Sequence, residues 1–178
     1  DFSELTVCTY DDPEPGMLAK ITGVLYGCTV DIHKAQVFTM ERERPLVLDT
    51  LWVRSGGMQI SEGRARRIRS SLLDVLTGRQ TLDQFLEAAG KQPPSAIPLD
   101  SIELRNDLTE EHTVVHMIAR DFEGLLYLMT MTLSRCRLDI HSAKVTTWHA
   151  RAENNFYVTT ASGGQIPDAE LAGWKEQL

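Results

Sequence analysis

Two short acidic turns, each ending in a glycine, are the segments of this sequence best suited to hold a ligand. They cover residues 11–16 (DDPEPG) and 121–124 (DFEG), and an apolar stretch follows each of them. The glycine permits close backbone approach, and the first N–H groups of a following helix have no partner within that helix. Such a helix start favours an anion such as an α-carboxylate, and acidic side chains beside it suit an ammonium group. These are the two ends of a free amino acid, although the same acidic residues could also serve only as helix caps.

The histidines and cysteines do not have the spacing of a catalytic or metal-binding site. His112 and His116 are four residues apart, but they fall on a predicted strand and not on a helix. The sequence contains no nucleophile elbow, no phosphate-binding loop and no His-Asp dyad. Cys8, Cys28 and Cys136 form no CxxC pair, which favours a reducing cytoplasm. We therefore expect no catalytic residues, no metal and no cofactor.

The composition is that of an ordinary globular protein, with 42% hydrophobic and 24% charged residues. The formal net charge of −7 argues against a nucleic-acid partner, because phosphate binding needs a basic face. The arginines within residues 64–69 scatter around a helix, so they indicate a solvated surface. No apolar run approaches the roughly 20 residues that a membrane span requires, and we expect no membrane partner.

An internal duplication organises the chain. The segment DIHKAQVFT at residues 31–39 recurs as DIHSAKVTT at 139–147, which is 108 positions later. The same offset relates the glycines of the two acidic turns and the apolar residues after them. Residues 51–53 match residues 156–158 at an offset of 105, so the second copy has a hairpin shorter by three residues. Several segments in register at nearly one offset indicate two copies of one structural unit.

Each copy has the same order of predicted elements, which is strand, helix, strand, strand, helix. The first helix begins after the glycine of the turn and, in the first copy, ends near Gly27. The first copy continues through an amphipathic piece at 82–89 and a Pro-rich linker to a fourth strand at 101–105. The remaining predictions for the first copy are strands at 5–10, 29–40 and 46–54 and a helix at 61–77, and for the second copy strands at 113–119, 138–149 and 152–160 and a helix at 168–178.

This order predicts an α+β fold of two tandem ferredoxin-like βαββαβ modules. We expect the first module at residues 1–106, with its Pro-rich linker at about 90–98, and the second at 107–178. The second module is predicted to lack its last strand. Its sheet then has an open edge, or another chain, the N-terminus or residues beyond this sequence complete it. Because open edges invite pairing, a homodimer through the sheet edges is one expectation.

The second strand of each copy breaks its own alternation. A strict period of two cannot place all its apolar residues on one face, so an extra residue is required near His33 and, in the second copy, near His141. Such a bulge can re-aim groups beside a binding site, or it can only increase the twist of the sheet. The apolar residues of this strand in the first copy are Val30, Ile32, Ala35 and Val37.

Both copies resemble ACT domains, and the pair is most similar to the C-terminal ACT pair of the bacterial protein-PII uridylyltransferase/uridylyl-removing enzymes. That family has a D-R-P-G-L-L-type turn, a second strand like D-A-x-I-F-T-T or H-x-A-K-V-T-T, and a third like D-T-F-x-V. The corresponding segments here are PEPGML at 13–18, AQVFT at 35–39, DTLWV at 49–53, DFEGLL at 121–126 and HSAKVTT at 141–147. The resemblance covers nearly the whole chain, and its specificity comes from the order and spacing of the motifs.

The resemblance implies a regulatory pair that is not itself an enzyme. In that family the pair binds glutamine and switches upstream catalytic domains between attaching and removing a uridylyl group on the PII nitrogen-signalling protein. The family's ligand sites lie at the turn before the first helix and along the second strand, often where two ACT domains meet. Carried over to this sequence, the ligand-binding residues are Asp11, Asp12, Pro15, Gly16, Met17, Leu18, His33, Ala35 and Gln36 in the first copy, and Asp121, Glu123, Gly124, Leu125, Leu126, His141, Ser142, Ala143 and Lys144 in the second.

Both turns depart from the family pattern. Pro13 stands where the first turn should begin with Asp, although Asp11 and Asp12 are adjacent, and Phe122-Glu123 replaces Arg-Pro in the second turn. Either site could therefore have altered affinity or none. Two alternatives to glutamine sensing follow from the sequence, namely a ligand-free dimerisation or docking module, and an ACT pair from another amino-acid-responsive protein.

Overall fold

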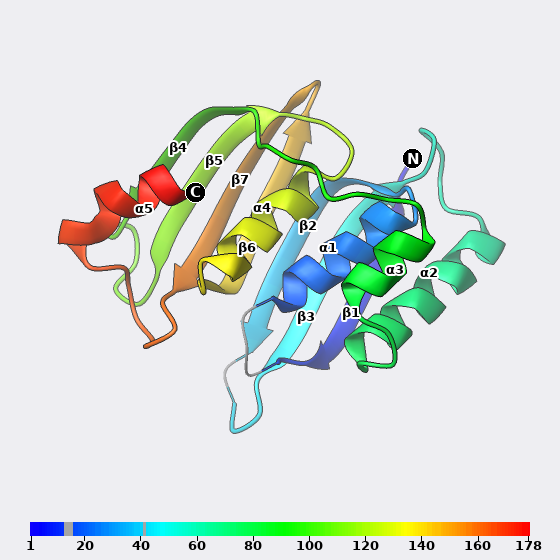
Figure 1. The fold of residues 1–178 in the computed structure, drawn as a ribbon, viewed down its shortest axis with the longest axis horizontal. Coiled ribbons are helices and arrows are strands. Elements are labelled where there is room, and N and C mark those ends of the chain that lie inside the picture. The colour runs from blue at the N-terminus through cyan, green and yellow to red at the C-terminus, as the bar shows by residue number, and fades with distance from the viewer. Residues whose placement is uncertain (13–15, 41) are drawn as a thin grey trace.

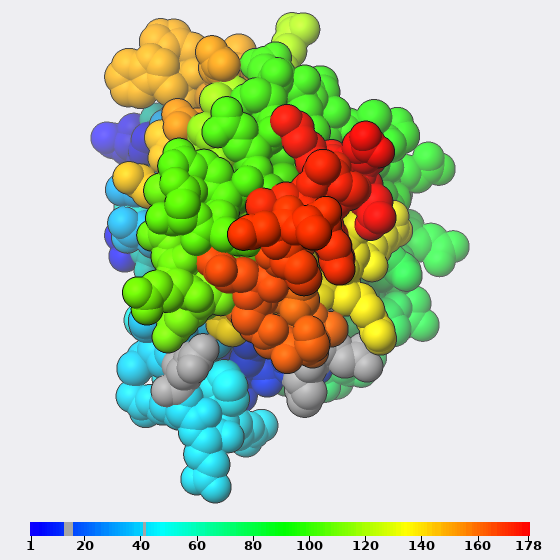
Figure 2. Space-filling model, turned by 90° about the vertical axis from the view of Figure 1, so that its left-hand side faces the viewer, coloured from blue at the N-terminus to red at the C-terminus, as the bar shows by residue number. Residues whose placement is uncertain are grey.

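A computed structural model describes residues 1–12, 16–40 and 42–178, and the strands in these ranges form one antiparallel sheet with the helices on one of its faces (Figure 1). Seen along the sheet from its β4 end, the helices lie on one side and the strands on the other (Figure 2). The fold is therefore a two-layer α+β arrangement, as predicted. The strands are β1 (Ser3–Tyr10), β2 (Asp31–Met40), β3 (Leu46–Arg54), β4 (Leu99–Arg105), β5 (Thr113–Arg120), β6 (Asp139–Trp148) and β7 (Arg151–Thr159), in the spatial order β1-β3-β2-β6-β7-β5-β4.

The predicted strands, and the two helices that follow β3, begin and end within two residues of their positions in the structure. The last helix differs more, because residues 168–170 form a 3₁₀ turn before the final α-helix begins. Within the described ranges, every helix is too short or too polar to reach across a lipid bilayer. The helices are α1 (Met17–Gly27), α2 (Glu62–Leu76), α3 (Leu82–Ala88), α4 (Leu125–Arg135) and α5 (Leu171–Gln177).

The two copies are related by a local two-fold axis through the middle of the sheet. Strands β2 and β6 pair antiparallel with Gln36 opposite Lys144, and these are equivalent positions 108 residues apart. Their neighbours pair reciprocally, with Ala35 opposite Val145 and Val37 opposite Ala143. Helices α1 and α4 pack against each other on the same axis. The duplication therefore produces one continuous sheet, and the two modules share an interface on both the sheet layer and the helix layer.

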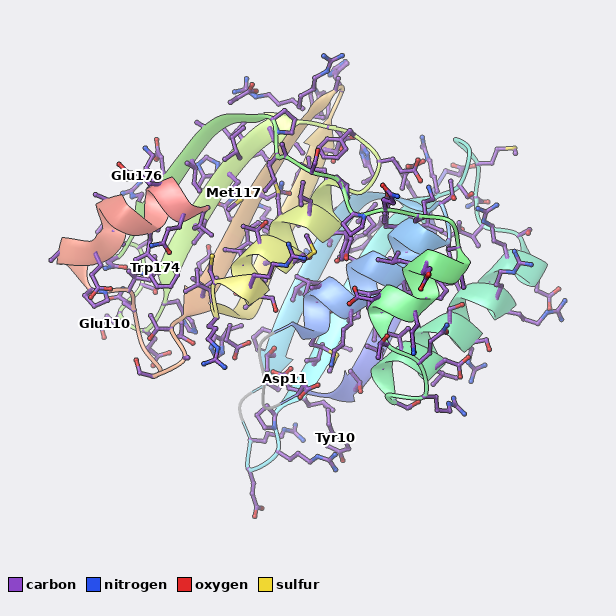
Figure 3. The ribbon with its side chains drawn as sticks, in the orientation of Figure 1. Tyr10, Asp11, Glu110, Met117, Trp174 and Glu176 are labelled. Atoms are coloured by element: carbon purple, nitrogen blue, oxygen red, sulfur yellow. The ribbon has the colours of Figure 1, made fainter. Side chains whose placement is uncertain are left out.

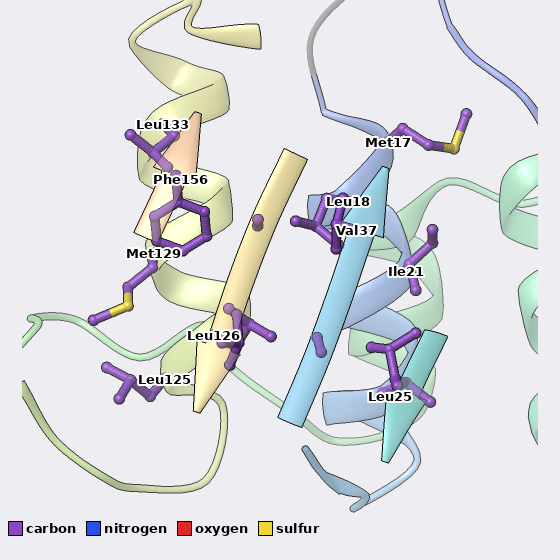
Figure 4. Packing of buried hydrophobic residues seen from close by; sticks show 14 of the residues in the cluster. Met17, Leu18, Ile21, Leu25, Val37, Leu125, Leu126, Met129, Leu133 and Phe156 are labelled. Atoms are coloured by element: carbon purple, nitrogen blue, oxygen red, sulfur yellow. The ribbon is translucent and has the colours of Figure 1, made fainter. Parts of the chain in front are cut away.

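A single apolar core runs beneath the helices of both modules. In α1 the apolar residues recur every three or four positions, so they form one face toward the sheet. Figure 4 shows side chains of α1, among them Leu18 and Ile21, and of α4, among them Leu126 and Met129, packed against β2 and β6. Burial of these apolar surfaces, at about 25 cal/mol per Å², is the main force that holds the modules together.

The fourth strand corrects the predicted topology. Strand β4 was predicted to complete the sheet of the first copy, but it pairs antiparallel with β5, with Ile102 opposite Met117. The second module therefore does not lack its last strand, because the segment before it supplies that strand. In the described part of the chain, β1 is left with β3 as its only strand partner. The domain boundary at residue 106 stays a prediction.

The C-terminal helix accompanies this exchange. Helix α5 packs against β4, and Trp174 and Glu176 mark its position at that end of the sheet, beyond Met117 of β5 (Figure 3). Residues 91–98 carry the chain from α3 in the first module across to β4 in the second (Figure 1). Because β1 and β5 are two copies of the same strand, the sequence of β4 does not show which of them it pairs with. The path of residues 91–98 places β4 beside β5.

Both predicted bulges are confirmed. The register of β2 against β3 shifts between Ile32 and Lys34, and that of β6 against β7 shifts between Ile140 and Ser142. The hairpin between β6 and β7 is also three residues shorter than that between β2 and β3, as the sequence offsets require. The bulges let the second strand of each copy direct apolar side chains toward the helices along its whole length.

Candidate functional site

Two clefts lie on the helix side of the sheet where the modules meet. In the first cleft, the start of α1 with Gly16 and Met17 faces Asp139 at the start of β6. In the second cleft, the start of α4 with Gly124 and Leu125 faces Asp31 at the start of β2. Each cleft thus combines the glycine turn of one module with the second strand of the other. The cavities within the clefts are small in the described structure, about 20 and 80 Å³ respectively.

The aspartates that open the two turns occupy equivalent places. The Asp11 N–H donates to the Pro45 carbonyl over 2.9 Å, and the Asp121 N–H donates to the Ala150 carbonyl over 2.9 Å, so each turn is tied to the hairpin of its own module. Asp11 therefore fills the family's Asp position, and the first turn is two residues longer than the second. Figure 3 shows Asp11 at the end of β1 beside the β2–β3 hairpin. Pro13 lies outside the described residues.

Both helices begin at a glycine with a positive φ, 135° at Gly16 and 91° at Gly124. A Cβ on Gly16 would lie 2.8 Å from Ser134 Oγ, and a Cβ on Gly124 would lie 2.8 Å from the Tyr26 ring. Positions 26 and 134 are themselves equivalent, so each glycine accommodates the helix of the other module. The close packing of the helices already requires both glycines. The first N–H groups of each helix have no acceptor within that helix, and the Leu125 N–H donates instead to the Phe122 carbonyl over 3.1 Å.

A pair of carboxylates lies at each cleft, one from each module. Burial raises the pKa of Asp11, and the nearby charge of Asp139 raises it further. In the second cleft, burial likewise raises the pKa of Asp121, with Asp31 as the neighbouring acid. Two carboxylates that repel each other are stabilised by a cation, so each cleft has an electrostatic preference for a positively charged group.

The most deeply buried acid of the described chain lines the first cleft. Asp49 projects from β3 toward the helices, is 0% exposed, and neither carboxylate oxygen has a hydrogen-bond partner of acceptable geometry in the described structure. Burial raises its pKa from 3.8 to about 7, and the Phe38 backbone amide offsets this only in part. The equivalent residue in the second cleft is Asn154, which is also buried and donates from Nδ2 to Met129 Sδ over 3.2 Å.

The structure brings together about half of the residues predicted for ligand binding. Asp12 and Glu123 instead form ion pairs beside the turns, with Lys20 at 2.6 Å and with Lys91 at 2.5 Å. Pro15 lies outside the described residues. The predicted residues that line the clefts are Asp11, Gly16, Met17 and Leu18 in the first, and Asp121, Gly124, Leu125 and Leu126 in the second.

The predicted residues of the second strands do not line either cleft. Ala35 and Ala143 are buried in the core, and Gln36 and Lys144 are exposed on the sheet face that carries no helices. His33 stacks on the Phe2 ring at 4.6 Å. His141 Nε2 hydrogen-bonds with Thr159 Oγ1 over 2.8 Å, and Ser142 lies opposite Phe38 in the sheet.

Comparisons with known proteins give the chain's relatives. No protein-family model matches it. The chain is 32% identical to the bifunctional uridylyltransferase/uridylyl-removing enzyme of Rhodospirillum rubrum over 99% of its length, and 33% identical to that of Gluconobacter oxydans, also over 99%. It is a homologue of one segment of these enzymes. The chain spans 19% of the length of both relatives. The aspartate kinase structure from Synechocystis overlaps 96% of this chain and 25% of its own, at 12% identity and a TM-score of 0.47.

The clefts also contain residues that the sequence analysis did not predict. Asp31 and Asp139 precede the predicted strand residues by two or more positions and enter the clefts of the opposite module. Asp49 had a signal in the sequence, because it lies among inward-facing apolar positions of β3. Among the described residues, no group of three or more His, Cys, Asp or Glu is placed to hold a metal ion.

Proposed function

We propose that this chain is the amino-acid-sensing pair of a uridylyltransferase/uridylyl-removing enzyme, that glutamine is its ligand, and that the parent enzyme acts on the PII nitrogen-signalling protein in the cytoplasm. The relatives' names support the parent enzyme. The observation that carries the sensing role is the composition of the clefts, because each joins a helix start from one module to an acidic strand start from the other.

The charges of the clefts fit an α-amino acid. The N–H groups at the start of α1 have no acceptor within the helix, so they suit a carboxylate. The Asp11 and Asp139 carboxylates, whose repulsion raises the pKa of Asp11, suit an ammonium group at the same cleft. A zwitterion satisfies both requirements, whereas a simple anion or cation satisfies one of them.

A ligand between modules can act as a regulator by linkage. Since each cleft has walls from both modules, a bound amino acid stabilises the arrangement in which these walls are at the correct distance. An equilibrium is shifted only by a difference in affinity between two arrangements, and that difference is available to neighbouring catalytic domains of the same enzyme.

Calorimetric titration tests this function. We expect the folded 178-residue chain to bind L-glutamine more tightly than L-glutamate, L-asparagine and the remaining proteinogenic amino acids. Binding of another amino acid with no response to glutamine would assign the pair to a different amino-acid-responsive enzyme. If no amino acid binds to the folded chain, the sensing function is wrong.

The open edge of the sheet favours a second function, dimerisation. Strand β1 has a free edge in the described structure, and an apolar row crosses the neighbouring strands on the helix-free face, where Leu48 lies between Cys8 and Phe38. Phe38 is 54% exposed. Exposed edges and apolar rows are common contact surfaces. Sedimentation-equilibrium measurements with and without glutamine decide this point, since a ligand-free docking module would form dimers and bind no amino acid.

A further inference from the structure

We propose that the two clefts are not equivalent. In the first cleft the buried carboxylate of Asp49 binds the ammonium group of the amino acid, so the chain binds one ligand, in this cleft. This inference rests on the proposed sensing function and deepens it. It assigns a specificity-determining role to Asp49, which lies outside both glycine turns. It also predicts that only one of the two clefts binds the ligand.

The surroundings of Asp49 leave its charge uncompensated. It lies on β3 between Val7 of β1 and Val37 of β2, on the face covered by helices. It is fully buried, and apart from the partial compensation by the Phe38 backbone amide neither oxygen has a hydrogen-bond partner in the described structure. An ionised carboxylate in such a position costs several kcal/mol unless a cation or several donors approach it. Asp49 lines the first cleft, so a cation bound in this cleft would lie beside its carboxylate.

The neighbouring acids add to the demand for a cation. Asp11 at the end of β1 acts on Asp49 through its charge, and Asp139 at the start of β6 acts on Asp11. In the described part of the chain the nearby basic groups include His141 on β6, which lowers the pKa of Asp11 and lies 3.8 Å from Asp139 Oδ2, and Lys20 on α1, which is paired with Asp12 at 2.6 Å. An ammonium group at this cleft would therefore meet three carboxylates.

The start of α1 supplies the second half of the recognition. Met17 and Leu18, the first residues of an eleven-residue helix, line the same cleft as Asp49. The free N–H groups at this helix start favour a carboxylate. The two ends of one α-amino acid thus both have partners among the residues that line the first cleft.

The second cleft has the same walls but a different chemistry. Asn154 replaces the carboxylate with a neutral amide, and this amide already donates to Met129 Sδ. The Tyr26 ring also lies against Gly124, and its hydroxyl donates to the Gln92 carbonyl over 2.8 Å, which closes the linker over the start of α4. Size alone would favour the second cleft, because its unfilled space is larger. We nevertheless assign the ligand to the first cleft, because the charge of a buried carboxylate contributes more to the affinity for an ammonium group than a larger volume does.

Binding at Asp49 has a consequence for protons. Because the carboxylate is largely desolvated, it holds a proton until near neutral pH when the cleft contains no cation, and an ammonium ligand requires the ionised form. Ligand binding near pH 7 therefore releases a proton from Asp49. In the second cleft Asn154 cannot titrate, so any binding there lacks this release.

The experiment is a calorimetric comparison of four proteins, the parent and three variants, with two probes. The probes are L-glutamine and glutaramate, which is glutamine without its α-amino group. The proteins are the parent chain, Asp49→Asn, Asn154→Asp and Asn154→Leu, each checked for folding by circular dichroism. We expect one glutamine per parent chain, at least tenfold weaker binding in Asp49→Asn, and affinity within about threefold of the parent in both Asn154 variants. Glutaramate should bind the parent at least tenfold more weakly than glutamine does, and this preference should shrink in Asp49→Asn.

Proton release on the parent chain provides a test that does not depend on the folding of any variant. Glutamine titrations near pH 7 in buffers of different ionisation enthalpy should show a net release of protons. Unchanged affinity in Asp49→Asn, loss of binding in Asn154→Leu alone, or no proton release would each overturn the assignment while the sensing function stands. Failure of the parent to bind any amino acid would remove the sensing function as well.

Discussion

The hydroxyl oxygens of Thr22 and Thr130 lie 2.9 Å apart in the buried contact between α1 and α4, and the two residues are separated by 108 positions in the sequence. They are equivalent residues of the two copies, so this hydrogen bond lies on the local two-fold axis. Thr22 lines the second cleft and Thr130 lines the first. The threonine pair is therefore the polar contact that joins the two clefts, in an interface that is otherwise largely apolar.

The first prediction concerns this pair. In Thr22→Val or Thr130→Val the remaining hydroxyl loses its partner across the interface and keeps only the carbonyl of its own helix, so we expect the free energy of unfolding to fall by about 1 kcal/mol. The double variant should cost less than the two single changes together, because the hydrogen bond between the two helices is lost only once. Urea unfolding measures all three. Thr132→Val is the matched control, since Thr132 makes the same bond to its own helix, to the Leu128 carbonyl, and none across the interface in the described structure.

The second prediction is a pH dependence from Asp49. Burial raises the pKa of this carboxyl from 3.8 to about 7 in the folded chain. Between these two values the unfolded chain has lost a proton that the folded chain retains, so the free energy of unfolding decreases as the pH rises through this window. Well below pH 3.8 the carboxyl is protonated in both states and the cost is absent. Since one pKa unit corresponds to about 1.4 kcal/mol, the total decrease is on the order of 4 kcal/mol.

Asp49→Asn isolates this contribution. Relative to the parent, the variant should gain stability as the pH rises from 4 to 7, while the smaller effects of Asp11 and Asp121, whose pKa values burial also raises, remain in both proteins. Urea unfolding at several pH values gives the two curves. Parallel curves for parent and variant would mean that Asp49 is ionised in the folded chain across this range.

Most of the fold could be predicted because its signals are local. The repeat of residues 31–39 at 139–147 specifies two copies, and the shift of apolar positions around His33 specifies a bulge. Both follow from the chemistry of neighbouring residues. The partner of β4 could not be predicted in this way, because β1 and β5 are copies of one strand and present similar edges. The path of residues 91–98 decides between them, and that path is a property of the whole structure.

The sequence predicts only the side of each cleft that the glycine turn forms. The glycine turns are recognisable because a glycine directly before an apolar helical stretch is typical of a tight turn at a helix start. Asp31 and Asp139 belong to the clefts only because β2 and β6 pair across the interface, which the sequence pattern does not contain. Asp49 is different, since a carboxylate between Val47 and Leu51 on the buried face of a strand is a visible anomaly.

The third prediction tests where β4 belongs. Ile102 is 9% exposed and pairs with Met117 of β5, so Ile102→Ala should lower the free energy of unfolding by about 2 to 4 kcal/mol. Hydrogen exchange should show the larger loss of protection in β5 and β7 and the smaller loss in β1 and β3. Val7→Ala in β1 is the matched control and should reverse this order. A greater loss in β1 after Ile102→Ala would contradict the assignment of β4 to the second module.

The last prediction separates the two reasons for glycine at the start of α4. Gly124 has a φ of 91°, and a Cβ there would also lie 2.8 Å from the Tyr26 ring, whereas Gly78 has a φ of 73° with open space around it. Gly78→Ala should therefore cost about 1 to 2 kcal/mol from backbone strain alone, and Gly124→Ala should cost more. Adding Tyr26→Ala, which leaves no atom beyond Cβ at position 26, removes the contact with the ring. In a double-mutant cycle from thermal or urea unfolding, the two changes should then cost less together than separately. Strict additivity would show that the Tyr26 ring moves aside freely and that only backbone strain selects glycine at this turn.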